Sequence, residues 1–193
     1  MKETFCIAGL GNTGLTYAHT RHNVGFDTAE RIAGHFQVSL NKSLCRARLA
    51  EVSLPGERRL VIAQPQTLMN LSGECAADLL SWYKIEPDHL LVLCDDIDLP
   101  CGRIRLRRAG GPGTHNGLRN IVALLGRQDF PRLRIGVGAP PDGDLISWVL
   151  GRPFIREEQE ALRQALDRAA EAALDWVEHG VEHAMTHFNG QQA

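Results

Sequence analysis

The stretch Phe5-Cys6-Ile7-Ala8-Gly9-Leu10-Gly11-Asn12-Thr13-Gly14 decides how the chain begins to fold. Its first residues are apolar and predict a short buried strand, which the glycines follow in the spacing G-x-G-x-x-G. A dinucleotide-binding loop has this spacing, but it also needs a helix that starts inside the motif and an acidic residue about twenty positions later. Residues 16–23 are instead polar and irregular, and the next predicted helix follows them. We therefore expect no dinucleotide, and infer that the glycines allow a sharp turn and close backbone approach.

Beyond this stretch, apolar or alternating runs predict strands, and periodic apolar stripes predict helices. The predicted strands are residues 5–8, 44–54, 58–63, 90–94, 103–107 and 133–138, of which 44–54 and 58–63 read as a hairpin. The predicted helices are residues 23–36, 70–83 and 118–125, a short one near Ile146, a long one from about Arg156 and another after Gly180. This order predicts an α/β fold, with residues 1–193 as a single three-layer domain. Its mixed, mostly parallel central sheet is flanked by helices, and its C-terminus is helical.

The composition is ordinary for a globular protein, with 44% hydrophobic and 23% charged residues in a chain of 193. No apolar run reaches the length of a transmembrane helix, and the first residues lead directly into a strand. We therefore expect no signal peptide, no membrane association and a cytoplasmic location. The five cysteines include no C-x-x-C pair, which predicts reduced thiols. A net charge of −2 gives no overall attraction to polyanions, so any contact with nucleic acid requires a local basic patch.

Four polar clusters fall at the ends of predicted strands or helices, where the sites of α/β proteins usually lie. They are residues 12–23, Met69-Asn70, residues 95–98 and His115-Asn116. A histidine acts as a general base near neutral pH, and works better when a carboxylate holds its other ring nitrogen. Amide side chains hold a water or a developing oxyanion without adding net charge. Together the clusters offer an imidazole, a carboxylate partner for it, and three amides.

Five spaced motifs resemble those of bacterial peptidyl-tRNA hydrolases, and they occur in that family's order. They are residues 9–12 with Tyr17, residues 20–25, residues 64–73, residues 95–102 and residues 115–119. The similarity runs from Ile7 to about Pro153, and the helical C-terminus fits more loosely. The resemblance implies a monomer that hydrolyses the ester between a peptide's C-terminus and the 3′-terminal ribose of tRNA. It implies no cofactor and no metal.

The resemblance also implies roles for single residues. His22 matches the family's catalytic base, Asp95 matches the carboxylate that supports it, and Asn12 matches the residue that distinguishes a blocked from a free amino group. Further candidates for substrate and tRNA contact are Tyr17, Leu68, Met69, Asn70, His115 and Asn116. The sequence departs from the family pattern at Leu68, usually Phe, at Thr13, usually Pro, and at Thr114, usually Gly. None of these departures removes a reactive group.

The Arg103-Ile104-Arg105-Leu106-Arg107 segment alternates with a period of two, so its guanidinium groups share one face of a strand. The face is either simply solvated or binds a polyanion. The resemblance implies that basic residues here and on the strand near Arg134 clamp the tRNA 5′-phosphate. The candidates are Arg105, Arg107 and Arg134.

Other interpretations remain open at this point. Asp95, Asp96 and Asp98 are also compatible with a magnesium site, which the immediate turn at Leu99-Pro100 disfavours. Ser72 lacks the G-x-S-x-G motif of a nucleophilic serine. The set His179, His183 and His187 repeats every four residues, and we favour a polar helix face over a metal site. For the whole protein, the alternatives are a noncatalytic RNA-binding protein of the same fold and, less favoured, a nicotinamide-dependent oxidoreductase.

Overall fold

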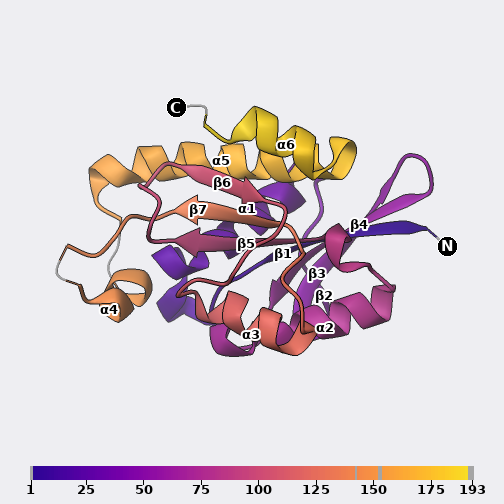
Figure 1. Ribbon diagram of the computed structural model, residues 1–193, viewed down its shortest axis with the longest axis horizontal. Helices are drawn as coiled ribbons and strands as arrows, with labels where there is room; N and C mark the ends of the chain where they lie inside the picture. The colour runs from indigo at the N-terminus through magenta and orange to yellow at the C-terminus, as the bar shows by residue number, and fades with distance from the viewer. Residues whose placement is uncertain (1, 142, 152–153, 191–193) are drawn as a thin grey trace.

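A mixed sheet forms the middle of the protein in the computed structural model, which describes residues 2–141, 143–151 and 154–190 (Figure 1). Within these ranges the sheet has seven strands in the order β2-β3-β4-β1-β5-β7-β6. The neighbours β4, β1, β5 and β7 run parallel, whereas β3 pairs antiparallel with both β2 and β4, and β6 with β7. The strands are β1 (Glu3–Gly9), β2 (Lys42–Leu44), β3 (Ala47–Leu54), β4 (Arg58–Pro65), β5 (Leu90–Asp96), β6 (Ile104–Arg107) and β7 (Arg132–Gly136).

Helices cover both faces of the sheet and confirm the expected layers (Figure 1). One face packs against α1 (Val24–His35) and α5 (Arg156–His179), with α6 (Val181–Phe188) beside α5. The other face packs against α2 (Ser72–Tyr83) and α3 (Asn116–Leu125). The short α4 (Leu145–Leu150) lies at one end of the molecule. The 3₁₀ turns are η1 (Leu15–Tyr17), η2 (Arg21–Asn23), η3 (Met69–Leu71) and η4 (Pro87–His89).

The two helical layers explain the patterns of the strands. Every residue of β5 is buried, because helices cover both faces of this central strand. The edge strand β6 alternates between buried and exposed residues, as its period of two predicts. On α5, the predicted apolar stripe is confirmed: Leu166, Ala169, Ala173 and Trp176 are buried, and Leu162 packs against the same core. No helix in the described ranges combines the length and apolar character that a membrane span requires.

The glycines of the opening stretch bring α1 against the end of β1. A Cβ on Gly9 would lie 2.2 Å from the carbonyl oxygen of Gly25, and one on Gly11 would lie 2.6 Å from the ring of Phe26. A Cβ on Gly25 would lie 2.5 Å from the carbonyl oxygen of Leu10. These approaches support the geometric interpretation of the motif, because each of the three positions has room for a glycine but not for a Cβ atom.

Gly25→Ala is expected to lower the free energy of unfolding by about 1–3 kcal/mol or more, since its new methyl group would overlap backbone atoms of Leu10, directly after β1, and of Leu93 on β5. Gly34→Ala on the same helix is the matched control, because a Cβ there meets nothing within 4 Å. Alanine favours the helix over glycine, so this control should leave stability unchanged or raise it by up to about 1 kcal/mol. Urea unfolding of both variants tests the claim, and equal stability would refute it.

Some boundaries differ from those predicted. Residues 42–44 add a strand to the predicted hairpin, so β2, β3 and β4 form a meander. The helix predicted from Asn70 starts at Ser72, after the turn η3, and the one predicted from Leu118 starts at Asn116. All five cysteines are free thiols in the structure, as predicted.

Candidate active site

A cavity of about 380 Å³, here called the cleft, opens at the carboxyl ends of the central strands. The loop after β1, the turns η2 and η3, the end of β5 and the start of α3 all contribute to its wall. All nine residues predicted as catalytic or substrate-binding line it: Asn12, Tyr17, His22, Leu68, Met69, Asn70, Asp95, His115 and Asn116. Sequence segments that lie far apart in the chain therefore converge on one space.

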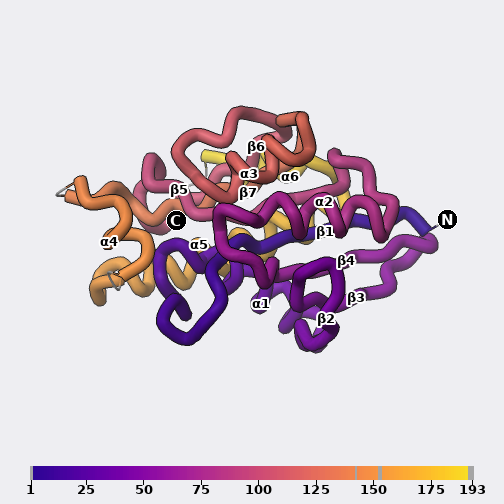
Figure 2. Tube along the Cα trace, turned by 90° about the horizontal axis from the view of Figure 1, so that it is seen from below, coloured from indigo at the N-terminus to yellow at the C-terminus, as the bar shows by residue number. Residues whose placement is uncertain are grey.

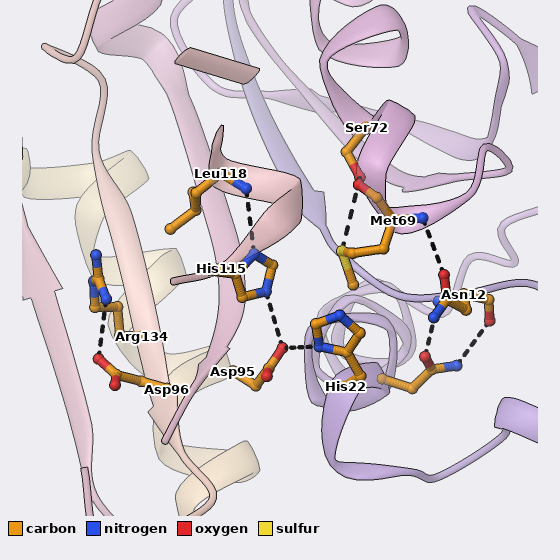
Figure 3. Close-up of polar contacts among 10 residues, drawn as sticks. Asn12, His22, Met69, Ser72, Asp95, Asp96, His115, Leu118 and Arg134 are labelled. Carbon is orange, nitrogen blue, oxygen red and sulfur yellow. Dashed lines mark hydrogen bonds and ion pairs between the residues drawn. The ribbon is translucent and has the colours of Figure 1, made fainter. Parts of the chain in front are cut away.

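His22 and Asp95 form a hydrogen-bonded pair in the cleft (Figure 3). The Nδ1 atom of His22 lies 2.8 Å from Oδ1 of Asp95, and their side chains are only 12% and 4% exposed. The end of β5 holds the acid and the turn η2 holds the ring, so both positions are set by backbone that packs against the core. This is the orientation that a general base requires, with one ring nitrogen held by a carboxylate.

His115 is a second histidine on the same carboxylate, which residue patterns alone did not indicate. Its Nε2 lies 3.0 Å from Oδ1 of Asp95, and its Nδ1 accepts a hydrogen bond from the N–H of Leu118 as the N-cap of α3. Because Nδ1 is an acceptor, the ring proton is on Nε2, and His115 donates to Asp95. His22 therefore shares its carboxylate partner with a ring whose tautomer is fixed.

These contacts change the ionisation of the pair. Burial alone would favour a neutral His22, but the charge of Asp95 and the hydrogen bond to it outweigh burial and raise the pKa of His22 above its usual value. For Asp95, burial favours the protonated acid, yet the two histidines and their hydrogen bonds hold the pKa of this carboxyl well below its usual range. Asp95 is therefore a carboxylate at any physiological pH.

Asn12 is fixed in the cleft by its own network (Figure 3). Its side-chain oxygen accepts from the N–H of Met69 at 3.0 Å, which leaves the amide NH₂ as the group that can donate to a ligand. Asn23 holds the backbone of Asn12 on both sides: its Oδ1 accepts from the Asn12 N–H at 2.8 Å, and its NH₂ donates to the Asn12 carbonyl at 2.9 Å. Asn23 directly precedes α1, but its side chain holds this backbone and caps no helix N–H.

The acidic residues after Asp95 have different partners. Asp96 Oδ2 lies 3.2 Å from Nη1 of Arg134, and Asp96 Oδ1 accepts from the N–H of Asp98. Since Asp95 is held by two histidines and Asp96 by an arginine, their oxygens do not converge with those of Asp98, which disfavours the magnesium alternative. Ser72 is buried and donates its hydroxyl to the Met69 carbonyl, so it is not placed as a nucleophile.

The comparison with known proteins agrees with this geometry. The family model described as peptidyl-tRNA hydrolase matches residues 6–193. The chain belongs to the peptidyl-tRNA hydrolase family. The match extends beyond Pro153, a residue outside the described ranges, and so includes the C-terminal helices that resembled the family only loosely.

Several relatives show the extent of the similarity. A peptidyl-tRNA hydrolase of Caldanaerobacter subterraneus subsp. tengcongensis is 46% identical over 186 residues, covering 96% of this chain and 100% of that protein. One of Roseiflexus sp. (strain RS-1) is 47% identical over 185 residues, covering 95% of this chain and 84% of that protein. The crystal structure of peptidyl-tRNA hydrolase from Acinetobacter baumannii matches with a TM-score of 0.90 at 34% identity, covering 100% of this chain and 97% of that one.

The three arginines predicted to clamp a phosphate lie on one face of the sheet in this protein. Arg105 and Arg134 are direct partners across the β6–β7 ladder, and Arg107 follows on the exposed side of β6. Arg134 lines the cleft and is held by Asp96 and by the carbonyl of Gly111. In the described ranges, Arg105 and Arg107 have no acidic side chain within ion-pair distance. They are therefore the two of the three that are available to an external anion.

Sequence reasoning missed an apolar wall of the cleft. Leu145, Ile146, Val149 and Leu150 of α4 line it together with Ile97. Ile146 is 72% exposed, which is unusual for so large an apolar side chain at the mouth of a polar cavity. An exposed apolar residue in a short helix gives no periodic signal, so only the fold shows that α4 reaches the site.

Arg21 attaches this wall to the turn that carries His22. Figure 2 shows the loop after β1 lying beside α4, and the guanidinium of Arg21 is 3.7 Å from the ring centroid of Trp148 in that helix. Arg21 is only 1% exposed, and its Nη2 is 2.6 Å from Glu158 of α5. The buried cation thus holds η2 and α4 in fixed relation.

Proposed function

We propose that the cleft hydrolyses the ester of peptidyl-tRNA, with His22 as the general base and Asp95 as its supporting carboxylate. The observation that carries the proposal is the 2.8 Å contact between His22 Nδ1 and Asp95, which leaves Nε2 of His22 as the basic nitrogen. Membership of the peptidyl-tRNA hydrolase family supports the substrate and the reaction class.

In this mechanism Nε2 of His22 takes a proton from water as the water oxygen attacks the ester carbonyl. The carbonyl electron pair moves onto its oxygen, and the tetrahedral intermediate then collapses by breaking the bond to the ribose oxygen. That oxygen regains a proton from the His22 imidazolium, which restores the base. The NH₂ of Asn12 and the amides of Asn70 and Asn116 face the same cavity and supply hydrogen bonds to the carbonyl or the water without adding charge.

The remaining cleft residues are proposed to hold the substrate. Tyr17 and the exposed Leu68 line the cleft and offer apolar surface, and Met69 is a buried part of the same lining. The two core clusters share one sheet, which supports a single domain, and we propose that the protein acts as a monomer, as the family resemblance implies. Because peptidyl-tRNA arises during translation, we also propose a cytoplasmic location.

Incubation of the protein with an N-acyl-aminoacyl-tRNA tests the reaction. We expect release of the acyl amino acid and of intact tRNA with a free 3′ end, detected by acid precipitation of the labelled acyl group. The noncatalytic alternative predicts a shift of tRNA mobility on a native gel without release of the label. Binding without release would refute the proposed function, because His22 and Asp95 would then be retained without use.

The double variant Arg105→Gln/Arg107→Gln is expected to raise KM for the tRNA substrate while leaving kcat nearly unchanged, since these side chains lie outside the cleft. The slope of log affinity against log salt should decrease in magnitude by about 1 per lost phosphate contact. Arg31→Gln/Arg163→Gln removes the same charge from the surface of α1 and α5 and is the matched control. Equal salt dependence of the two double variants would exclude the clamp.

A further inference from the structure

A ladder of one acid and three histidines lies at the junction of α5 and α6, away from the cleft. Asp175, His179, His183 and His187 follow one another at intervals of four residues. The first two are on α5 and the last two on α6, with the turn at Gly180 between them. Figure 1 shows this junction toward the N-terminal end of the molecule and α4, whose residues line the cleft, at the other end. The sequence alone favoured a polar face because no cysteine and no E-x-x-H arrangement accompanies the histidines, and it indicated no acidic partner for them.

The structure supplies that partner. The two carboxylate oxygens of Asp175 each contact one ring: Oδ1 lies 2.9 Å from Nδ1 of His179, and Oδ2 lies 2.8 Å from Nδ1 of His183. Potential ligand atoms of these three residues all lie within 4.8 Å of one another. Ligand atoms around a tetrahedral zinc ion with bonds of about 2.0–2.1 Å are roughly 3.3 Å apart, so only small side-chain shifts separate this cluster from a coordinating arrangement.

The cluster is accessible from solvent. The side chains of His179 and His183 are 57% and 40% exposed, and Asp175 is 16% exposed at the base of the pair. The ring of His187 stacks on His183 at 3.9 Å between centroids, and its Nδ1 lies 2.9 Å from the His183 carbonyl oxygen. His187 therefore supports the ring of His183 without contacting the Nδ1 atom of His183, which faces Asp175.

We propose that Asp175, His179 and His183 form a surface site for a divalent transition metal of the zinc class. Two imidazoles and one carboxylate, with a position left for water, are a donor set that such ions accept. On binding, each ring would carry its proton on Nε2 and present Nδ1 to the metal, so the rings stay neutral.

The similar set His22, Asp95 and His115 in the cleft does not meet the same requirement. There, Nδ1 of His115 accepts from the N–H of Leu118, so Nε2 must keep its proton and cannot become a metal ligand without loss of the helix cap. Among the described residues, the rings of His179 and His183 make no second side-chain hydrogen bond of this kind, and both of their tautomers are available.

Metal binding at this junction would fasten α6 to the end of α5. Helix α6 packs against the edge strand β6, and Asn189 just beyond it accepts from the N–H of Leu106 and donates to the Leu106 carbonyl. The site would thus stabilise the helix that covers β6, the strand that carries Arg105 and Arg107. Its role is in stability rather than in hydrolysis.

Isothermal titration of the full chain, prepared without a histidine tag, with ZnCl₂ or NiCl₂ tests the proposal. We expect the wild-type protein to bind one equivalent that Asp175→Asn/His179→Gln/His183→Gln lacks, and that His35→Gln, an exposed histidine on α1, retains. At zinc about a hundredfold above Kd, the folded-to-unfolded ratio of wild type should rise about 100-fold, seen as a higher melting temperature. Turnover without metal should be equal in all three proteins.

The variant His187→Gln tests whether His187 only supports the ring of His183 or is itself a metal ligand. It should keep the bound equivalent with weaker affinity, by a factor of about 10–100 at most, as expected for a residue that supports a ligand. Absence of any zinc binding by the wild type would overturn the proposal. So would an unchanged stoichiometry in the triple variant, because the metal would then be bound elsewhere.

Discussion

Replacement of His22 by alanine is expected to lower kcat for hydrolysis of N-acyl-aminoacyl-tRNA by about 10²–10⁴-fold, the usual contribution of a positioned general base. The water in the cleft would lose the only basic nitrogen held by Asp95 that is free to accept its proton, since Nε2 of His115 is a donor. KM should change little, because the ring is recessed and only 12% exposed. Single-turnover and steady-state release assays measure both quantities.

The chain offers a matched control for this variant in the same loop. His19 contacts Asp27 at 3.1 Å, but its side chain is 80% exposed and it does not line the cleft. Because His19 has a φ of 58°, asparagine is the substitution that tolerates its backbone best. His19→Asn should keep full turnover, and His22→Ala should keep the wild-type melting temperature within a few degrees. A kcat of His22→Ala close to that of the wild type would show that His22 is not the general base.

The strands and long helices were predictable because their buried faces give continuous or periodic apolar patterns in the sequence. The run Leu90-Leu91-Val92-Leu93-Cys94 predicts β5, and the stripe ending at Trp176 predicts α5, since each covers a continuous face of the core. Strand β2 has no such apolar pattern, because Lys42 and Ser43 are exposed and the strand is only three residues long. The turn η3 was likewise merged with α2, as 3₁₀ and α-helical residues share the same side-chain pattern over so short a segment.

The residues of the site could be predicted from the sequence, but the hydrogen bonds between them could not. Polar residues at strand ends, together with the family resemblance, indicated nine of the residues that line the cleft. They could not show that His115 donates to Asp95, or that Asn23 holds the backbone of Asn12, because both contacts join segments whose spacing follows no periodicity. The apolar wall of α4 was missed for a related reason. The sequence predicts a short helix near Ile146, but the exposure of this residue appears only when the fold is known.

The same limit applies to the ladder at the junction of α5 and α6. The spacing of His179, His183 and His187 was visible in the sequence, but it lies across the turn at Gly180. A straight helix would have drifted by about 40° for every four residues, which separates the first ring from the last. The turn instead brings His183 back to Asp175, eight residues earlier, and makes a cluster out of a pattern that alone predicts a polar face.

Replacement of Asp95 by asparagine is expected to lower kcat by about 10²–10⁴-fold while leaving the cleft intact. Both rings contact the same oxygen, Oδ1, so an amide that places its oxygen there still accepts hydrogen bonds from His22 and His115 but brings no negative charge. Without that charge, the imidazolium that His22 forms when it takes a proton from water is less stable, and His22 is a weaker base. The loss of rate therefore comes from a missing charge rather than from a missing ring.

The pH profile distinguishes this effect from a structural defect. In the wild type His22 must be neutral to act, and its pKa is raised because Asp95 outweighs burial, so kcat/KM falls as the pH drops through a value above the usual 6.5. In Asp95→Asn burial remains and the charge is gone, so the pKa of His22 falls and the acidic limb moves to lower pH. Asp27→Asn, which removes the carboxylate from the exposed pair with His19, should reproduce the wild-type profile. A lower plateau with an unmoved acidic limb would contradict the role of Asp95, because the limb reports the interaction of this carboxylate with His22 and not the amount of folded enzyme.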